Sequence, residues 1–137
     1  YSKYMDIIIL RPFFIYGKKQ HRSMLMPRLL DSIKLSKPIE IDGENGIKIN
    51  PIYVDDACEA TVNTLSLNSS DIFNIAGPEI LSIKQICNIL GRSIGKKPIF
   101  KNKKTIEKDL IANISKMKLF LHQPKITFSD KNHEISI

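Results

Sequence analysis

The sequence DIIILRPFFIYGKKQ, residues Asp6 to Gln20, begins with an apolar run that is typical of a buried β-strand. A strand that is apolar on both faces belongs inside a parallel sheet, where other strands flank it and helices cover it. Hardly any sequence precedes this strand. We therefore expect it to pair with a sheet that this chain does not encode, and the chain to be the later portion of a larger α/β protein.

The composition is that of an ordinary globular protein. The 137 residues are 42% hydrophobic and 26% charged, which is enough for one domain with a core. No apolar run reaches the ~20 residues that span a bilayer, and no secretory leader opens the sequence. We therefore predict a cytoplasmic protein with no membrane partner.

The net charge of +7 comes from lysines that are spread along the chain. One tight cluster contains Lys101, Lys103 and Lys104. Because no recognised DNA- or RNA-binding module accompanies this charge, we interpret the cluster as solvated surface and predict no nucleic-acid partner. A smaller anionic partner is compatible with the charge.

Apolar periodicity and turn signals predict alternating strands and helices. Residues 24–35 have helical spacing, and Asp-Gly and Asn-Gly turns indicate a β-hairpin over residues 39–49. The other predicted elements are a strand at 52–54, a helix through Cys58 and Leu65, a strand at 72–75, a helix from 83 to 94, a strand at 98–100 and a helix at 116–121 that Ser115 caps. The tail from Thr127 lacks clear periodicity, so we expect it to fray.

Two capping-box patterns mark helix starts. Asp56 precedes Glu59 by three residues, and Ser82 precedes Gln85 by three. Adjacent residues on a helix face different directions, so Asp55 and Asp56 do not form a catalytic carboxylate pair. We therefore assign Asp56 to helix capping.

Residue spacing alone yields no metal site and no catalytic set. The histidines His21, His122 and His133 are scattered, and none has metal-ligand spacing to another His, Cys or carboxylate. Cys58 and Cys87 each lie among apolar residues of a predicted helix. We expect both to be small buried side chains, not ligands or disulfide partners.

Four segments, in order, resemble segments of extended short-chain dehydrogenases/reductases. The first joins LRPFFIYGKKQ (residues 10–20) to MLMPRLL (residues 24–30), which is similar to the family pattern of Leu-Arg-Pro, Tyr-Gly and an apolar helix start with Pro. The other three segments are INPIYVDDACEA (49–60), IFNIAGPEILS (72–82) and SKMKLFLHQPKI (115–126). The chain resembles the NAD(P)-dependent epimerase/dehydratase group, most of whose members act on nucleotide-activated sugars.

The resemblance implies the C-terminal part of a doubly wound Rossmann-type enzyme, with one orphan parallel strand and a small mixed α/β substrate domain. Such enzymes bind NAD or NADP at a Gly-rich loop and move a proton with a Tyr-x-x-x-Lys pair. Neither motif occurs in this sequence, so we expect no catalytic residue here and a Rossmann half upstream. Residues 1–20 would form the last cofactor-facing strand and loop, residues 21–126 the substrate-binding portion and residues 127–137 a tail. The intact protein is expected to be a homodimer.

The resemblance also implies site residues. Phe13, with Pro12, matches a position whose backbone lies beside the nicotinamide. Met24 and Leu25 match positions whose backbone touches the nucleotide, and Tyr16 would shape the floor of the pocket. Core packing at a strand end is an equally good interpretation of the aromatic residues.

Two positions depart from the family pattern. Phe14 stands where Asn commonly hydrogen-bonds the substrate, and Ile49 stands where Arg commonly pairs with the pyrophosphate. Lys48, Arg22 or the lysines after Phe100 are then candidates to bind a diphosphate. Two alternatives stay open: a reductase or hydroxysteroid-type dehydrogenase of an apolar substrate, and a non-catalytic dinucleotide-binding or truncated relative.

Overall fold

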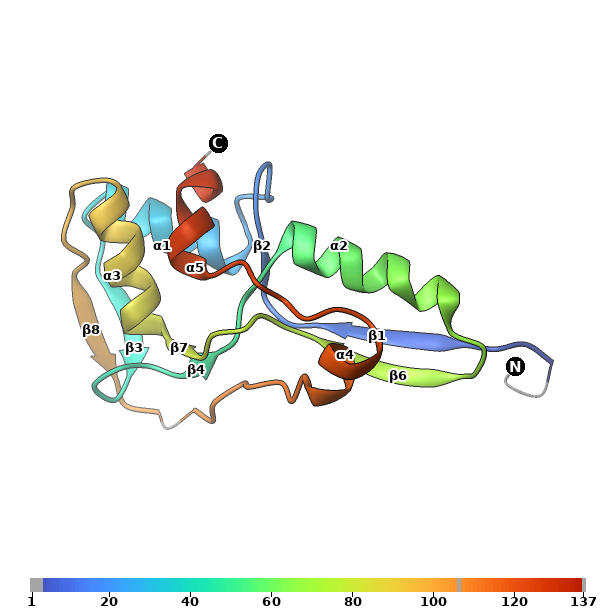
Figure 1. Cartoon of the computed structure of the whole chain (residues 1–137). Helices are drawn as coiled ribbons and strands as arrows, with labels where there is room; N and C mark the ends of the chain where they lie inside the picture. Colours follow the sequence, from blue (N-terminus) through green and yellow to red (C-terminus); the bar gives the residue numbers. More distant parts are fainter. Residues whose placement is uncertain (1–3, 106, 137) are drawn as a thin grey trace.

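Figure 1 shows an elongated molecule with two regions end to end, of which the computed structural model describes residues 4–105 and 107–136. The first region, the sheet end, consists of β1 (Ile8–Pro12), α2 (Val54–Asn63), a 3₁₀ turn (Thr64–Ser66), β6 (Asp71–Ile75) and α4 (Ser115–Phe120). The second region, the helical end, consists of α1 (Leu25–Lys34), β3 (Ile39–Asp42), α3 (Ile83–Ser93), β8 (Phe100–Lys103), α5 (Phe128–Lys131) and a 3₁₀ helix (Asn132–Ser136). Short strands join the two regions: β2 (Ile15–Tyr16), β4 (Lys48–Ile49), β5 (Ile52–Tyr53) and β7 (Leu81–Ser82).

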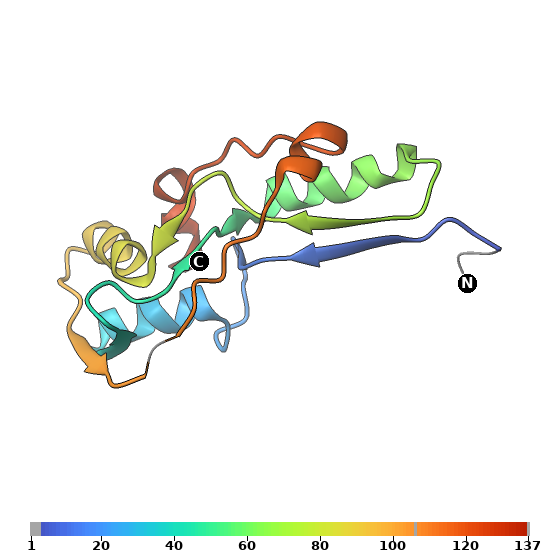
Figure 2. The ribbon, with the colours of Figure 1, turned by 90° about the horizontal axis from the view of Figure 1, so that it is seen from below.

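Strand β1 has a partner within the chain. It pairs in parallel with β6, and the two strands lie side by side in Figure 2. The expectation of an orphan strand is therefore wrong, because β6 is a second apolar strand that α2 returns to the same sheet. Among the described residues each strand is paired along one edge only, and Ile9 and Ile72 are 47% and 42% exposed.

The predicted hairpin over residues 39–49 does not form. Strand β3 pairs in parallel with β8, and β4 pairs antiparallel with β7. The turn glycines do turn the chain: Gly43 and Gly46 have φ of 59° and 70°. Ile39 and Ile41 are buried in the core of the helical end, so packing there, rather than the turn, selects the partner strand.

Helices α1 and α3 form where the sequence predicts them. The capping box at the start of α3 is confirmed, since the Ser82 hydroxyl accepts the Gln85 N–H at 3.2 Å and the Gln85 side chain accepts the Ser82 N–H at 2.8 Å. Gly95, with φ of 67°, follows the end of α3. Cys87 on this helix is fully buried, as expected.

Helix α2 differs from its prediction in two ways. It begins at Val54, its cap residue Tyr53 makes no side-chain cap bond, and Asp56 lies inside the first turn. The capping role of Asp56 is therefore wrong. Cys58 is exposed, because α2 buries the face that carries Asp56, Ala57 and Ala60 instead.

Two later elements also shift. The predicted strand at 98–100 is displaced to β8, which pairs along the whole of β3. Ser115 is the first residue of α4 and not its cap; its N–H donates to the Asn113 side chain at 3.0 Å.

Residues 127–136 are folded, contrary to the expectation that the tail from Thr127 frays. Phe128 and Ile135 are buried in the core of the helical end. The Tyr53 hydroxyl donates to the buried Glu134 carboxylate. Two isolated apolar residues anchor the tail without repeating periodically, which is why the pattern contained no helix signal.

The core has two clusters of buried side chains. One fills the helical end around α1, β3 and α3, and the other packs α2, β6 and α4 at the sheet end. None of the described helices is long and apolar enough to cross a membrane.

Candidate functional site

Two cavities adjoin the C-terminal end of β1, the edge at which open parallel sheets bind ligands. The smaller, of about 310 Å³, is lined by Pro12, Phe14, Ile15, Gln20, Met24, Leu25 and Met26. The larger, of about 540 Å³, lies among α1, β3 and the loop before β4. Phe14 and Leu25 line both cavities, so the two are adjacent and together make up the candidate site.

A left-handed residue shapes the exit of β1. Phe14 has φ of 47°, an uncommon conformation for a bulky side chain. It sends consecutive aromatic side chains to opposite sides: Phe13 packs against the sheet-end core, and Phe14 packs against the helical-end core. The main chain is held here by the bond from Phe13 N–H to Ile75 O at 2.9 Å and from Ile52 N–H to Phe14 O at 3.3 Å. Backbone strain of this kind persists where surrounding structure enforces it, often at functional sites.

The structure brings four of the expected site residues together. Pro12, Phe14, Met24 and Leu25 all line the smaller cavity. They meet because the loop after β2 brings the start of α1 back beside the end of β1. Their contacts with a ligand stay a prediction.

Tyr16 lies elsewhere. It is 1% exposed, its hydroxyl donates to the Thr127 carbonyl at 3.0 Å, and its ring packs edge-on against Tyr53 and Phe128. Burial and the nearby Glu79 carboxylate raise the pKa of its hydroxyl far above the usual value. Tyr16 thus serves as a core residue and lines neither cavity.

The structure also places the two expected cations away from the cavities. Arg22 forms an ion pair with Asp31 of α1. Lys48 lies on β4, where its main-chain N–H donates to the Asp109 carboxylate at 2.7 Å, and it is not among the residues that line either cavity. Ile49 is 0% exposed, so the position at which the resemblance implied Arg is filled by a core side chain.

Two cations line the larger cavity: Arg28 of α1, which sequence reasoning did not single out, and Lys103 of β8, one of the lysines after Phe100 that it named as candidates. The Lys103 ammonium lies 2.6 Å from the Glu107 carboxylate, whose hydrogen bond raises the pKa of Lys103. The Arg28 guanidinium has no hydrogen-bond or ion-pair partner among residues 4–105 and 107–136. Only the pairing of β3 with β8 brings these side chains to one cavity, so no local pattern could have indicated that Arg28 and Lys103 meet there.

A reciprocal amide pair holds the segment after β8 against β4. The Asn50 side chain donates to the Ala112 carbonyl and accepts the Ala112 N–H, both at 2.9 Å. The Asn50 side chain and the Ala112 main chain are both buried, so each satisfies hydrogen-bonding groups of the other that water does not reach. This pair fixes the segment whose Leu110 lines the larger cavity.

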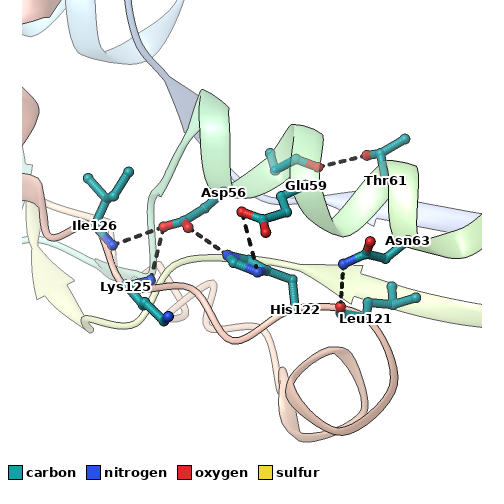
Figure 3. Close-up of polar contacts among 9 residues, drawn as sticks. Asp56, Glu59, Thr61, Asn63, Leu121, His122, Lys125 and Ile126 are labelled. Carbon is teal, nitrogen blue, oxygen red and sulfur yellow. Dashed lines mark hydrogen bonds and ion pairs between the residues drawn. The ribbon is translucent and has the colours of Figure 1, made fainter.

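Figure 3 shows a second polar cluster, on α2 at the sheet end. The Asp56 carboxylate lies 2.7 Å from Nε2 of His122 and accepts the N–H groups of Lys125 at 3.1 Å and Ile126 at 2.9 Å. Glu59 lies 3.7 Å from Nδ1 of the same ring. The prediction that no histidine lies near potential metal ligands is therefore wrong, because the fold brings together residues 66 apart in the sequence.

Comparisons with known proteins agree with this architecture. Residues 1–76 match the model of the NAD dependent epimerase/dehydratase family. The chain is 33% identical over 131 residues to UDP-glucuronate 4-epimerase of Thermodesulfobacterium geofontis (strain OPF15), and the match covers 92% of this chain and 41% of that protein.

Two solved structures extend the comparison. A variant of UDP-glucuronic acid 4-epimerase from Bacillus cereus, in complex with UDP-4-deoxy-4-fluoro-glucuronic acid and NAD, superposes with a TM-score of 0.84 at 30% identity, over 96% of this chain and 44% of that one. UDP-glucose 4-epimerase of Thermus thermophilus, in complex with NAD, superposes with a TM-score of 0.79 at 18% identity, over 98% and 46%, which shows a shared fold.

The chain thus spans less than half the length of these relatives and corresponds to their C-terminal part. The predicted fold class, the later portion of an extended Rossmann-type enzyme, is confirmed by these superpositions. Because the family model covers more than half of its 137 residues, the chain belongs to the NAD-dependent epimerase/dehydratase family.

Proposed function

We propose that this chain forms the substrate-binding part of an NAD-dependent UDP-sugar 4-epimerase, with UDP-glucuronic acid as its substrate. The observation that carries the proposal is the 33% identity with a UDP-glucuronate 4-epimerase over 92% of the chain. NAD, when bound, accepts a hydride from the substrate and returns it. We also propose that the active protein is a cytoplasmic homodimer in which residues 1–20 adjoin an NAD-binding Rossmann half and residues 21–126 bind the substrate.

The smaller cavity is proposed to hold the part of the substrate next to the cofactor. Pro12 is the last residue of the strand that would face NAD and Phe13 follows it, and Phe14 lines both this cavity and the larger one. The Met24 N–H donates to the His21 carbonyl at 3.0 Å, so the Leu25 N–H, at the first turn of α1 and without a helical partner, is the main-chain donor proposed to contact the nucleotide.

Arg28 and Lys103 are proposed to bind the diphosphate. Both line the larger cavity, and the Arg28 guanidinium is available for a bidentate contact. Arg22 forms an ion pair with Asp31, and the side chain of Ile49 is buried. Arg28 and Lys103 are therefore proposed to make the diphosphate contacts that were expected from positions 22 and 49.

The experiment measures conversion of UDP-glucuronic acid to its C4 epimer by the protein that contains this chain, with NAD present. Arg28→Ala should raise KM about 10- to 100-fold, the equivalent of one charge-assisted hydrogen bond of roughly 1.5–3 kcal/mol. Lys34→Ala, on the same helix but outside the cavity, is the matched control and should leave KM unchanged. Absence of both epimerisation and UDP binding would overturn the proposal.

A second candidate is a reductase or dehydrogenase of an apolar substrate. The apolar wall of the larger cavity favours it; this wall consists of Phe14, Leu25, Leu29, Pro38, Ile39, Ile41, Ile47, Ile83 and Leu110. Calorimetry of the intact protein with UDP separates the two candidates, since the dehydrogenase has no reason to bind UDP. A single catalytic turnover by the intact protein would exclude the third candidate, a non-catalytic relative.

A further inference from the structure

The imidazole of His122 lies between two carboxylates of α2. Asp56 and Glu59 are three residues apart and therefore lie on one face of the helix. His122 follows α4 and reaches this face from the far end of the sequence (Figure 3). One potential ligand atom from each of the three side chains lies within 4.8 Å of the others.

Asp56 determines the orientation of the ring. Its carboxylate is 4% exposed and accepts the N–H groups of Lys125 and Ile126 through one oxygen. The other oxygen lies 2.7 Å from Nε2 of His122. A carboxylate is an acceptor only, so Nε2 carries the proton and Nδ1 points toward Glu59.

Nδ1 of His122 and the Glu59 carboxylate face each other without a hydrogen bond between them. Their separation of 3.7 Å exceeds hydrogen-bond distance. When a metal binds at Nδ1, the ring keeps its proton at Nε2 and presents the Nδ1 lone pair toward the Glu59 carboxylate. A cation between them would satisfy both.

The geometry suits a metal ion. With metal–ligand bonds of roughly 2.1 Å, two ligands of one zinc ion are separated by about 3.4 to 3.6 Å for angles between tetrahedral and ~120°, close to the 3.7 Å between Nδ1 and Glu59. A carboxylate on the far nitrogen is also the usual partner of a zinc-bound histidine. We propose that Glu59 and His122 bind a divalent cation of the zinc class, with Asp56 as the residue that positions the imidazole.

The surroundings favour zinc over magnesium. A hollow of about 580 Å³ opens beside the cluster and gives water access to complete the coordination. Lys118 and Lys125 line the same hollow. Their positive charge opposes an ion that is held by charge alone, whereas zinc also gains from bonding to an imidazole nitrogen.

Zinc at this position would tie the segment after α4 to α2. The same segment leads into α5, whose Phe128 ring packs edge-on against the ring of Tyr16. The inference is independent of the proposed epimerase activity, because the cluster lies apart from both cavities of the candidate site.

The test is a titration of the intact protein with Zn²⁺ in competition with a chromophoric chelator. We expect one equivalent to bind, and binding to weaken at least tenfold in Glu59→Gln and in His122→Gln. The Glu59 side chain is 63% accessible, so Glu59→Gln should keep the fold. It therefore still tests the proposal if the more buried His122→Gln variant fails to fold. His21 is an exposed histidine that contacts Ser23. The variant His21→Gln is therefore the matched control and should bind Zn²⁺ as tightly as the wild type.

Hydrogen exchange supplies a second readout. Zn²⁺ should slow exchange of the Lys125 and Ile126 amides in the wild type and leave it unchanged in Glu59→Gln. The proposal is overturned if no single equivalent binds, if Glu59→Gln binds as tightly as the wild type, or if His21→Gln loses the binding.

Discussion

Replacing Asp56 by alanine removes the acceptor of three hydrogen bonds at once. The amides of Lys125 and Ile126 and the Nε2–H of His122 would lose their partner. A buried donor left without an acceptor costs roughly 1–3 kcal/mol, and partial access of water reduces the total. We therefore expect the local opening free energy of residues 121–126 to fall by about 3 kcal/mol, which corresponds to about 100-fold more opening.

The assay is native-state hydrogen exchange of the Lys125 and Ile126 amides in the intact protein, because it reports local opening residue by residue. Asp55→Ala is the matched control. It removes the same charge from the same helix turn, but Asp55 is exposed. If Asp56→Ala accelerates exchange no more than Asp55→Ala does, the carboxylate does not hold this segment and the reasoning is wrong.

Four further predictions concern other parts of the molecule. A Cβ added at Gly77 would lie 1.8 Å from the carbonyl oxygen of Pro51, so Gly77→Ala should destabilise the protein by about 3 kcal/mol; thermal unfolding within about 1 °C of wild type would contradict this. The hydrogen bond from Tyr53 lowers the pKa of Glu134 below its ordinary value of 4.5, so this stabilisation is present above pH 4.5 and is lost as the pH falls through the lower folded pKa. Glu134→Gln should abolish that part of an acid titration followed by circular dichroism. Phe14→Asn introduces a side chain that tolerates φ of 47° and can hydrogen-bond into the cavity, so KM for UDP-glucuronic acid should fall severalfold, and a rise would count against the site. The chain produced by itself should self-associate, since β1 and β6 each have an unpaired edge among the described residues; light scattering from a monodisperse monomer would refute this.

Sequence patterns succeeded where short-range physics decides the outcome. Helix α3 begins at its capping box and is followed by Gly95, because cap hydrogen bonds and the left-handed turn involve residues within one helical turn. Helix α1 forms where apolar residues recur at helical spacing, which is also a relation between residues within about one helical turn. The resemblance of four ordered segments identified the family, which the family model confirms over residues 1–76.

Part of the candidate site could be expected from the same segments. Pro12, Phe14, Met24 and Leu25 lie close together because they belong to one resembling stretch, in which a strand, a loop and a helix start are consecutive. Tyr16 belongs to the same stretch but points into the core, and the sequence could not distinguish these two directions.

Tertiary structure alone decided which segments pair and what the polar side chains do. The glycines of residues 39–49 are compatible with a hairpin, yet β3 takes β8 as its partner and so brings Lys103 to the cavity that Arg28 lines. Asp56 has the spacing of a cap, yet it accepts bonds from His122 and the segment beyond it. Local patterns specify the elements because cap and turn energies depend on neighbouring residues. Strand partners and buried polar contacts depend on groups far along the chain, whose positions are set only when the core packs.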